Sequence, residues 1–167
     1  MDVSALQTVD LSVRRLWCLS QPLPHFARGL VTSLRSIGIP ALIQGFLPPG
    51  RHLARVRDVR KRFVDQFPES VSRSPIFKQW VELRSALRSQ GCFLYQWLNG
   101  SFITDKQNPS DIDIVTFFDG VAFEGLPEWR QNLVGHLCSG RCVHHSLPFS
   151  RVDSNFVAVF QRDIQST

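Results

Sequence analysis

The sequence predicts an α/β (α+β) domain in which helices pack on a small mixed β-sheet, and three observations lead to this fold class. Helical and extended patterns intermix along the chain instead of forming separate blocks. Two apolar runs rich in β-favouring residues occupy residues 92–100 and 111–118. A chain of 167 residues with 43% hydrophobic content is long enough for one compact domain but too short for two comfortable ones.

The chain changes character near residue 39, which we take as the start of this domain (39–167). Residues 1–38 have weak periodicity and two prolines, so they are expected to form a poorly ordered N-terminal extension. Residues 1–62 contain ten Lys or Arg against three Asp or Glu, whereas residues 63–167 contain nine against eleven. The basic surface is therefore expected in the N-terminal part of the protein.

Two helices are expected before the first strand. Between Leu53 and Phe67 apolar residues recur at three- and four-residue steps with Arg or Lys in the gaps, which predicts a basic amphipathic helix. In the second helix Ser74 is the expected N-cap, Pro75 the first helical residue and Gly91 the end. Its buried stripe is expected to comprise Ile76, Trp80, Leu83 and Leu87.

The remaining elements follow the second strand, which Asp119-Gly120 is expected to close with a turn. Residues 127–140 are predicted to form a helix that ends at Gly140, and residues 142–149 and 155–160 are predicted to be strands.

The composition favours a cytoplasmic protein with no membrane span. No run approaches the roughly 20 consecutive apolar residues that a span requires. The first residues lack the charged-then-apolar order of a secretory signal, although their acid-poor, Arg- and Ser-containing character is also typical of an organelle transit peptide. Four unevenly spaced cysteines do not suggest a disulfide framework, so reduced thiols are expected.

The second strand carries the pattern that points to chemistry. In an extended segment Asp111 and Asp113 would share one face while Ile112 and Ile114 point into the core. Two adjacent carboxylates repel each other unless a cation lies between them. Ligation by oxygen alone suits Mg²⁺ or Mn²⁺, so Asp111 and Asp113 are the candidate metal ligands. The bland alternative is an exposed strand end at which carboxylates cap nearby N–H groups.

A Gly-Ser pair precedes these carboxylates and directly follows the first strand. Gly100 would let the backbone approach a ligand closely, and N–H groups with the Ser101 hydroxyl can hold phosphate oxygens. Lys106 in the connection is a candidate for phosphate contact, although a loop lysine is more often solvated. A phosphate cradle facing a metal clamp is typical of phosphoryl or nucleotidyl transfer.

The segment "LNGSFITDKQNPSDIDIV" resembles the signature of the DNA polymerase beta-like nucleotidyltransferase superfamily: Gly-Ser, a spacer of about ten residues, then Asp-hydrophobic-Asp-hydrophobic. With "GFLPPGRH", it is also similar to a family of small, largely uncharacterised bacterial nucleotidyltransferase-like proteins. The resemblance implies a minimal nucleotidyltransferase-like core with a nucleoside triphosphate at Gly100-Ser101 and two Mg²⁺ ions on Asp111 and Asp113.

The resemblance also implies a third carboxylate, on a neighbouring strand, which completes the metal site and helps to deprotonate the acceptor. At the expected strand the sequence reads "CVHHSLPF", with His144 and His145 in place of an aspartate, while Asp153 is expected in a loop. A histidine can act as a general base near neutral pH but is a poor Mg²⁺ ligand. The candidate catalytic residues are therefore Asp111, Asp113, His145 and Asp153.

The expected activity is transfer of a nucleoside monophosphate from Mg-NTP to a hydroxyl on a protein or a tRNA, with a toxin-antitoxin partner implied by relatives of this size. The alternative is a non-catalytic nucleotide-binding or antitoxin-like module with a degraded third carboxylate. A shortened member, whose catalytic residue lay beyond Thr167, is a third reading. A zinc site is a further alternative. Its candidate ligands are His136, Cys138, Cys142, His144 and His145, but their spacing matches no standard zinc finger.

Overall fold

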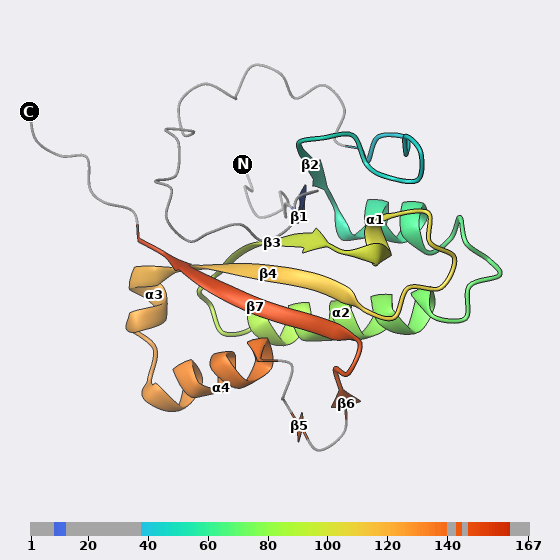
Figure 1. The fold of residues 1–167 in the computed structure, drawn as a ribbon. Coiled ribbons are helices and arrows are strands. Elements are labelled where there is room, and N and C mark those ends of the chain that lie inside the picture. The colour runs from blue at the N-terminus through green and yellow to red at the C-terminus, as the bar shows by residue number, and fades with distance from the viewer. Residues whose placement is uncertain (1–8, 13–37, 140–142, 145–146, 161–167) are drawn as a thin grey trace, which may run out of the picture.

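The computed structural model describes residues 9–12, 38–139, 143–144 and 147–160 (Figure 1). The strands of the main sheet are β1 (Val9–Ser12), β2 (Arg51–Ala54), β3 (Phe93–Asn99), β4 (Ile112–Asp119) and β7 (Val152–Val159). The helices are α1 (Val56–Phe63), α2 (Arg73–Arg88), α3 (Gly120–Glu124) and α4 (Glu128–Cys138), and a 3₁₀ turn, η1, spans Ser101–Ile103. A separate pair consists of β5 (Val143–His144) and β6 (Leu147–Pro148).

The main sheet is mixed, with the strand order β2-β1-β3-β4-β7. β4 is antiparallel to β3 and parallel to β7, while β1 is parallel to β3 and antiparallel to β2. The predicted small mixed sheet with packed helices is thus confirmed. β1 comes from the segment 1–38, which the sequence analysis assigned to an extension, so at least residues 9–12 belong to the sheet.

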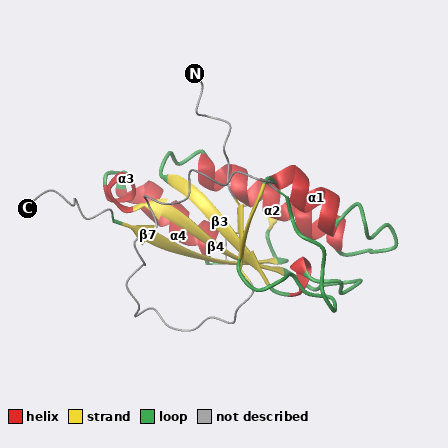
Figure 2. Cartoon of the chain, turned by 90° about the horizontal axis from the view of Figure 1, so that it is seen from above, coloured by secondary structure: helices red, strands yellow, loops and turns green. Residues whose placement is uncertain are grey.

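Helices α2, α3 and α4 lie on one side of the sheet, below β4 and β7 in Figure 1. In the view from above, the strands partly cover α4 (Figure 2). The core between these layers contains the predicted stripe of α2, whose four residues are fully buried. The sheet contributes Leu98 from β3 and Ile112, Ile114 and Phe118 from β4, and α4 contributes Val134 and Leu137. The period of 3.6 residues therefore located the inner face of α2 correctly.

A polar group sits in this core at the contact of β3 with α2. Gln96 is fully buried, and its side-chain oxygen accepts hydrogen bonds from Trp80 Nε1 at 3.0 Å and from Arg84 Nη1 at 3.2 Å. Its amide nitrogen donates to Thr116 Oγ1 of β4 at 2.9 Å. A buried amide costs free energy unless it is hydrogen-bonded, so these bonds hold α2 in one register on the two central strands.

Several predicted boundaries differ from the structure, including the end of the first helix, which is Phe63 and not Phe67. Residues 51–54 form β2, and not the start of a helix, because β1 pairs with them edge to edge. α2 begins at Arg73 with Ser72 at the N-cap position, and Ser70 Oγ accepts the hydrogen bond from the Arg73 N–H at 3.2 Å. Asp119 ends β4 and caps the short helix α3, accepting from Ala122 N. β7 starts at Val152, three residues before the predicted strand.

Arg73 fixes the loop that leads from η1 toward β4. The side chain is fully buried, with Nη1 donating to the carbonyls of Phe63 at 2.9 Å and Phe102 at 2.7 Å. Nη2 donates to the carbonyls of Thr104 at 2.8 Å and Lys106 at 2.6 Å. Burial lowers the pKa of Arg73 to about 10, partly offset by Asp105. One guanidinium thus joins the end of α1, η1 and the following loop.

None of the helices in the described part of the chain is both long enough and apolar enough to cross a membrane.

We expect Arg73→Met to lower the free energy of unfolding by roughly 3–5 kcal/mol, because four carbonyl oxygens lose their charged donor while the apolar volume is kept. Urea unfolding followed by circular dichroism measures this change. Arg60→Met is the matched control: Arg60 lies on the surface of α1, with Nε 3.4 Å from Asp65 Oδ1, and its loss should cost at most about 1 kcal/mol. Equal losses in the two variants would contradict the proposed role of Arg73.

Candidate active site

The Gly-Ser pair lies where the chain leaves the sheet at the end of β3. Gly100 follows Asn99 with φ of 78° and ψ of −165°, and Ser101 begins η1. Residues with a Cβ rarely adopt a positive φ of this size, so the turn requires glycine.

Gly100 is packed against the carboxylate of Asp113. A Cβ added at Gly100 would overlap Oδ2 and Cγ of Asp113. The strand register explains this contact, because Asn99 of β3 is the partner of Asp113 in β4. The missing side chain therefore makes room for a carboxylate of the protein itself, and the turn and the carboxylate belong to one site.

Asp113 lies on the face of the sheet that points away from α2 and α4. Its neighbours Ile112 and Ile114 are 0% and 2% exposed, whereas Asp113 is half-buried. Since side chains alternate along a strand, the two isoleucines enter the core and Asp113 takes the other face, as predicted. Asp111 lies just before the strand, half-buried, and Ser110 Oγ donates to its Oδ1 at 3.1 Å.

Asp153 lies beside Asp113, and the expectation that it would be in a loop is wrong. Asp153 is the second residue of β7, which runs parallel to β4, and the register pairs Asp153 with Asp113 directly. Val152 and Ser154 on either side are buried, and Asp153 is exposed. The alternation therefore puts the side chains of Asp113 and Asp153 on the same face of adjacent strands.

The strand that was expected to carry the third carboxylate is not a neighbour of β4. Residues 143–144 and 147–148 form the separate β5–β6 pair, with Val143 opposite Pro148. His144 belongs to β5, and His145 lies outside the described residues. The assignment of "CVHHSLPF" to the strand next to Asp113 is therefore wrong, because β7 occupies that position.

The charges of Asp111 and Asp153 act on the carboxyl group of Asp113. Burial raises the pKa of the Asp113 carboxyl above its usual range, the charges of Asp111 and Asp153 raise it further, and a backbone hydrogen bond opposes them. Like charges at close range disfavour ionisation unless a cation lies between them.

The donor set fits a hard divalent cation in its chemistry. Three carboxylates on or next to two adjacent strands offer oxygen ligands only, the set that Mg²⁺ and Mn²⁺ prefer, and the half-exposed positions leave room for waters and phosphate oxygens. Within the described ranges, the His, Cys, Asp and Glu side chains do not converge in groups of three or more that could hold a metal ion. Binding would therefore require side-chain rotation of these carboxylates.

Hydrogen bonds of backbone N–H and carbonyl groups hold the connection between η1 and β4 in place. The Lys106 N–H donates to Thr104 Oγ1 at 3.2 Å, and its carbonyl accepts from Arg73. The Asp105 N–H donates to the carbonyl of Gly45 at 3.0 Å, which joins "GFLPPGRH" to the loop after Gly-Ser. The Lys106 side chain is exposed, and its contact with a phosphate stays a prediction.

One of the five candidate zinc ligands is buried in the hydrophobic core. Cys138 at the end of α4 is 3% exposed and packs in the main hydrophobic cluster. Burial raises the pKa of this thiol to about 12, so it stays protonated at neutral pH. Cys142 and His145 lie outside the described residues.

Sequence reasoning missed Arg73 and the strand position of Asp153. The local sequence around Arg73 does not mark it as a buried residue. Its role follows only from the four carbonyl oxygens that converge on its guanidinium. Asp153 carried one available signal: the alternation of Val152, Ser154 and the apolar residues after them extends the predicted strand towards its N-terminus.

Comparison with known proteins assigns the family. A family model described as "Family of unknown function (DUF6932)" matches residues 40–163, about three quarters of the chain. The chain belongs to this family. Neither a curated protein nor a solved structure matches the chain. The matched range includes all residues of the candidate site, from Gly100 to Asp153.

We expect Gly100→Ala to destabilise the protein more than Gly91→Ala. Gly91 also has a positive φ, of 87°, but a Cβ there would meet nothing within 4 Å, so this control isolates the backbone cost of about 1–2 kcal/mol. At Gly100 the overlap with Asp113 adds to that cost. Urea unfolding at neutral pH measures the free energy of unfolding of both variants. An equal decrease in the two would show that the Asp113 carboxylate moves aside at no cost.

Asp113→Asn should raise the melting temperature in metal-free buffer at pH 7. The pKa of Asp113 is raised in the folded state, so its favourable contribution is present below the unfolded-state pKa and is lost as pH rises through the folded-state pKa. Ionised Asp113 is therefore destabilising at neutral pH, and the amide removes that charge. The control is Asp119→Asn at the other end of β4, where Asn keeps the cap of α3. A lower melting temperature for Asp113→Asn would contradict the charge repulsion.

Proposed function

We propose that the protein is a cytoplasmic nucleotidyltransferase that binds Mg-NTP or Mn-NTP at Gly100-Ser101 and transfers a nucleoside monophosphate to a hydroxyl acceptor. The observation that supports this proposal is the pairing of Asp153 with Asp113 on adjacent parallel strands. The resemblance at Gly-Ser and Asp-x-Asp implies a third carboxylate next to the second, and this pairing supplies a candidate for it. Asp153 therefore replaces His145 as the preferred third residue.

Each residue of the site has a role in this proposal. Asp111 and Asp113 would hold the cation, with Asp153 completing the site, and the cation would neutralise charge on the phosphates. The Ser101 hydroxyl and nearby N–H groups would hold phosphate oxygens, next to the Asp113 carboxylate that Gly100 accommodates. The rigid connection held by Arg73 keeps η1, and with it Ser101, in place.

In the proposed transfer step one bond to the α-phosphorus forms and another breaks. The acceptor hydroxyl oxygen attacks the α-phosphorus, the bond from that phosphorus to the bridging oxygen breaks, and pyrophosphate leaves with the bonding electrons. The hydroxyl proton passes to the carboxylate of Asp153, which is exposed and can reach an incoming acceptor. The products are pyrophosphate and a phosphodiester that joins the nucleoside to the acceptor oxygen.

The non-catalytic nucleotide-binding or antitoxin-like module is the competing proposal. Its main support in the sequence was the missing third carboxylate, and the position of Asp153 removes that support. The acceptor class, protein or tRNA, and a toxin-antitoxin partner stay open proposals that a transfer assay on both substrates separates.

Asp153→Asn should reduce transfer by roughly 10²–10⁴-fold, the usual range for loss of a general base. The assay follows label from each α-³²P-NTP, with Mg²⁺ or Mn²⁺, onto bulk tRNA and onto extract proteins. Asp119→Asn, on the same strand but at its other end, is the control and should transfer like wild type. Transfer by wild type that survives in Asp153→Asn would remove Asp153 from the mechanism. Magnesium-dependent nucleotide binding without any transfer would favour the non-catalytic module.

A further inference from the structure

A depression that is open to solvent, which we call the cavity, lies between the start of α1 and the last turns of α2, away from the carboxylates. It has a volume of about 490 Å³ and is lined by Val56, Val81, Arg84, Ser85, Arg88 and Ser89. The C-terminal end of α2 is followed by the first residues of β3, whereas Gly100 and Asp113 lie at the opposite end of that strand. The cavity is therefore separate from the candidate active site.

Arg84 brings a buried charge to this cavity. Its side chain is 3% exposed, Nη1 donates to Gln96, and its guanidinium lies over the Phe93 ring at 4.6 Å from the centroid. Nη2 is buried without a hydrogen-bond partner among the described residues, and no described carboxylate forms an ion pair with Arg84. A buried guanidinium with an unused N–H and no counter-charge is costly unless a further group compensates it.

Arg88 adds a second positive charge one helical turn later. It is exposed at the rim of the cavity, and its charge, after burial itself, lowers the pKa of Arg84 to about 10. Two guanidiniums that repel each other favour an anion between or beside them. Arginine is also the side chain best suited to phosphate oxygens, because its planar fork donates two parallel hydrogen bonds.

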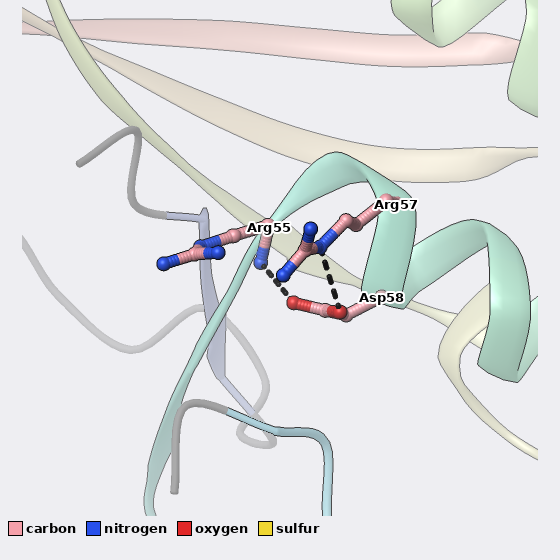
Figure 3. A network of polar contacts seen from close by, with 3 residues as sticks. All are labelled: Arg55, Arg57 and Asp58. Atoms are coloured by element: carbon pink, nitrogen blue, oxygen red, sulfur yellow. Dashed lines mark hydrogen bonds and ion pairs between the residues drawn. The ribbon is translucent and has the colours of Figure 1, made fainter. Parts of the chain in front are cut away.

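The first residue of α1 completes the wall. Val56, the first residue of α1, lines the cavity, so the positive end of that helix lies beside it. Asp58 in the first turn accepts from the Arg55 N–H at 3.0 Å and lies 3.6 Å from Arg57 Nε, so its charge is engaged on α1 (Figure 3). The guanidinium of Arg55 points away from Asp58 in the same view (Figure 3).

We propose that this cavity binds a phosphate group, with Arg88 and the Ser85 hydroxyl as donors and Arg84 as the buried charge behind them. Ser89 is a weaker candidate because its hydroxyl already donates to the Ala86 carbonyl at 2.7 Å. The volume exceeds that of a bare phosphate and falls in the range of about 300–1,000 Å³ that small-ligand sites occupy. The phosphate belongs either to a phosphorylated small molecule or to an RNA backbone.

The test titrates inorganic phosphate, a mononucleotide and a short single-stranded RNA into ¹⁵N-labelled full-length protein in EDTA, so that metal-dependent binding at the carboxylates does not contribute. We expect the amide signals of residues 84–89 to shift with each probe. Arg88→Glu should weaken binding by about tenfold or more, as expected for loss of a charge-assisted hydrogen bond. Arg88→Gln, which keeps a neutral side chain at the end of α2, should weaken it in the same direction.

Lys61→Glu on α1 is the matched control, since it makes the same change of charge at an exposed position outside the cavity. Equal weakening by Lys61→Glu and Arg88→Glu, or no shift at residues 84–89 at millimolar phosphate, would overturn the proposal. A mononucleotide that binds as tightly as RNA would identify a small molecule, and tighter, strongly salt-dependent RNA binding would identify a nucleic-acid backbone. Asp111→Ala/Asp113→Ala should leave this binding unchanged, which separates its outcome from that of the transferase assay.

Discussion

The candidate site depends on how β4 is aligned with its two neighbouring strands at Asp113. β3 brings Asn99 to one side of Asp113, and β7 brings Asp153 to the other. A slip of one residue in either pairing would turn the opposing side chains to the other face of the sheet. The buried residues Ile112, Ile114, Val152 and Ser154 fix both registers, because they must enter the core. The packing of the core thus determines which polar side chains lie next to one another on the opposite face of the sheet.

The 3₁₀ turn η1, which begins at Ser101, and the loop after it are held in place by one cationic side chain. Arg73 donates to four carbonyls from three segments, and its ring contacts with Phe67 and Phe102 fill the remaining space, with the guanidinium carbon 3.8 Å and 5.4 Å from the two ring centroids. Carbonyl groups that would otherwise face the interior unpaired are satisfied by one side chain. Because the guanidinium is planar, its donors also dictate where the segments lie relative to one another.

Charge is divided between two ends of the molecule. Asp111, Asp113 and Asp153 gather where β4 and β7 begin, whereas Arg84 and Arg88 lie near the other end of the sheet, at the close of α2. Each group raises the energy of its own members, as the raised pKa of Asp113 and the lowered pKa of Arg84 indicate. Such local repulsion lowers stability, and a ligand of opposite charge would relieve it: the proposed cation in the first case and the proposed phosphate in the second.

The sequence alone determined the local elements with strong periodicity and the pattern that marks the site. The stripe of α2, the strands around Trp97 and Ile114, and the alternation that separates Asp113 from the isoleucines all follow from local spacing. Only the tertiary structure decided that β7, and not the segment 142–149, lies next to β4, and that residues 51–54 extend as a strand beside β1. The reason is physical: strand order and register come from burial of faces and pairing of backbone groups between distant segments, which no local pattern contains. The same limit hid Arg73, whose four partners come together only in the folded chain.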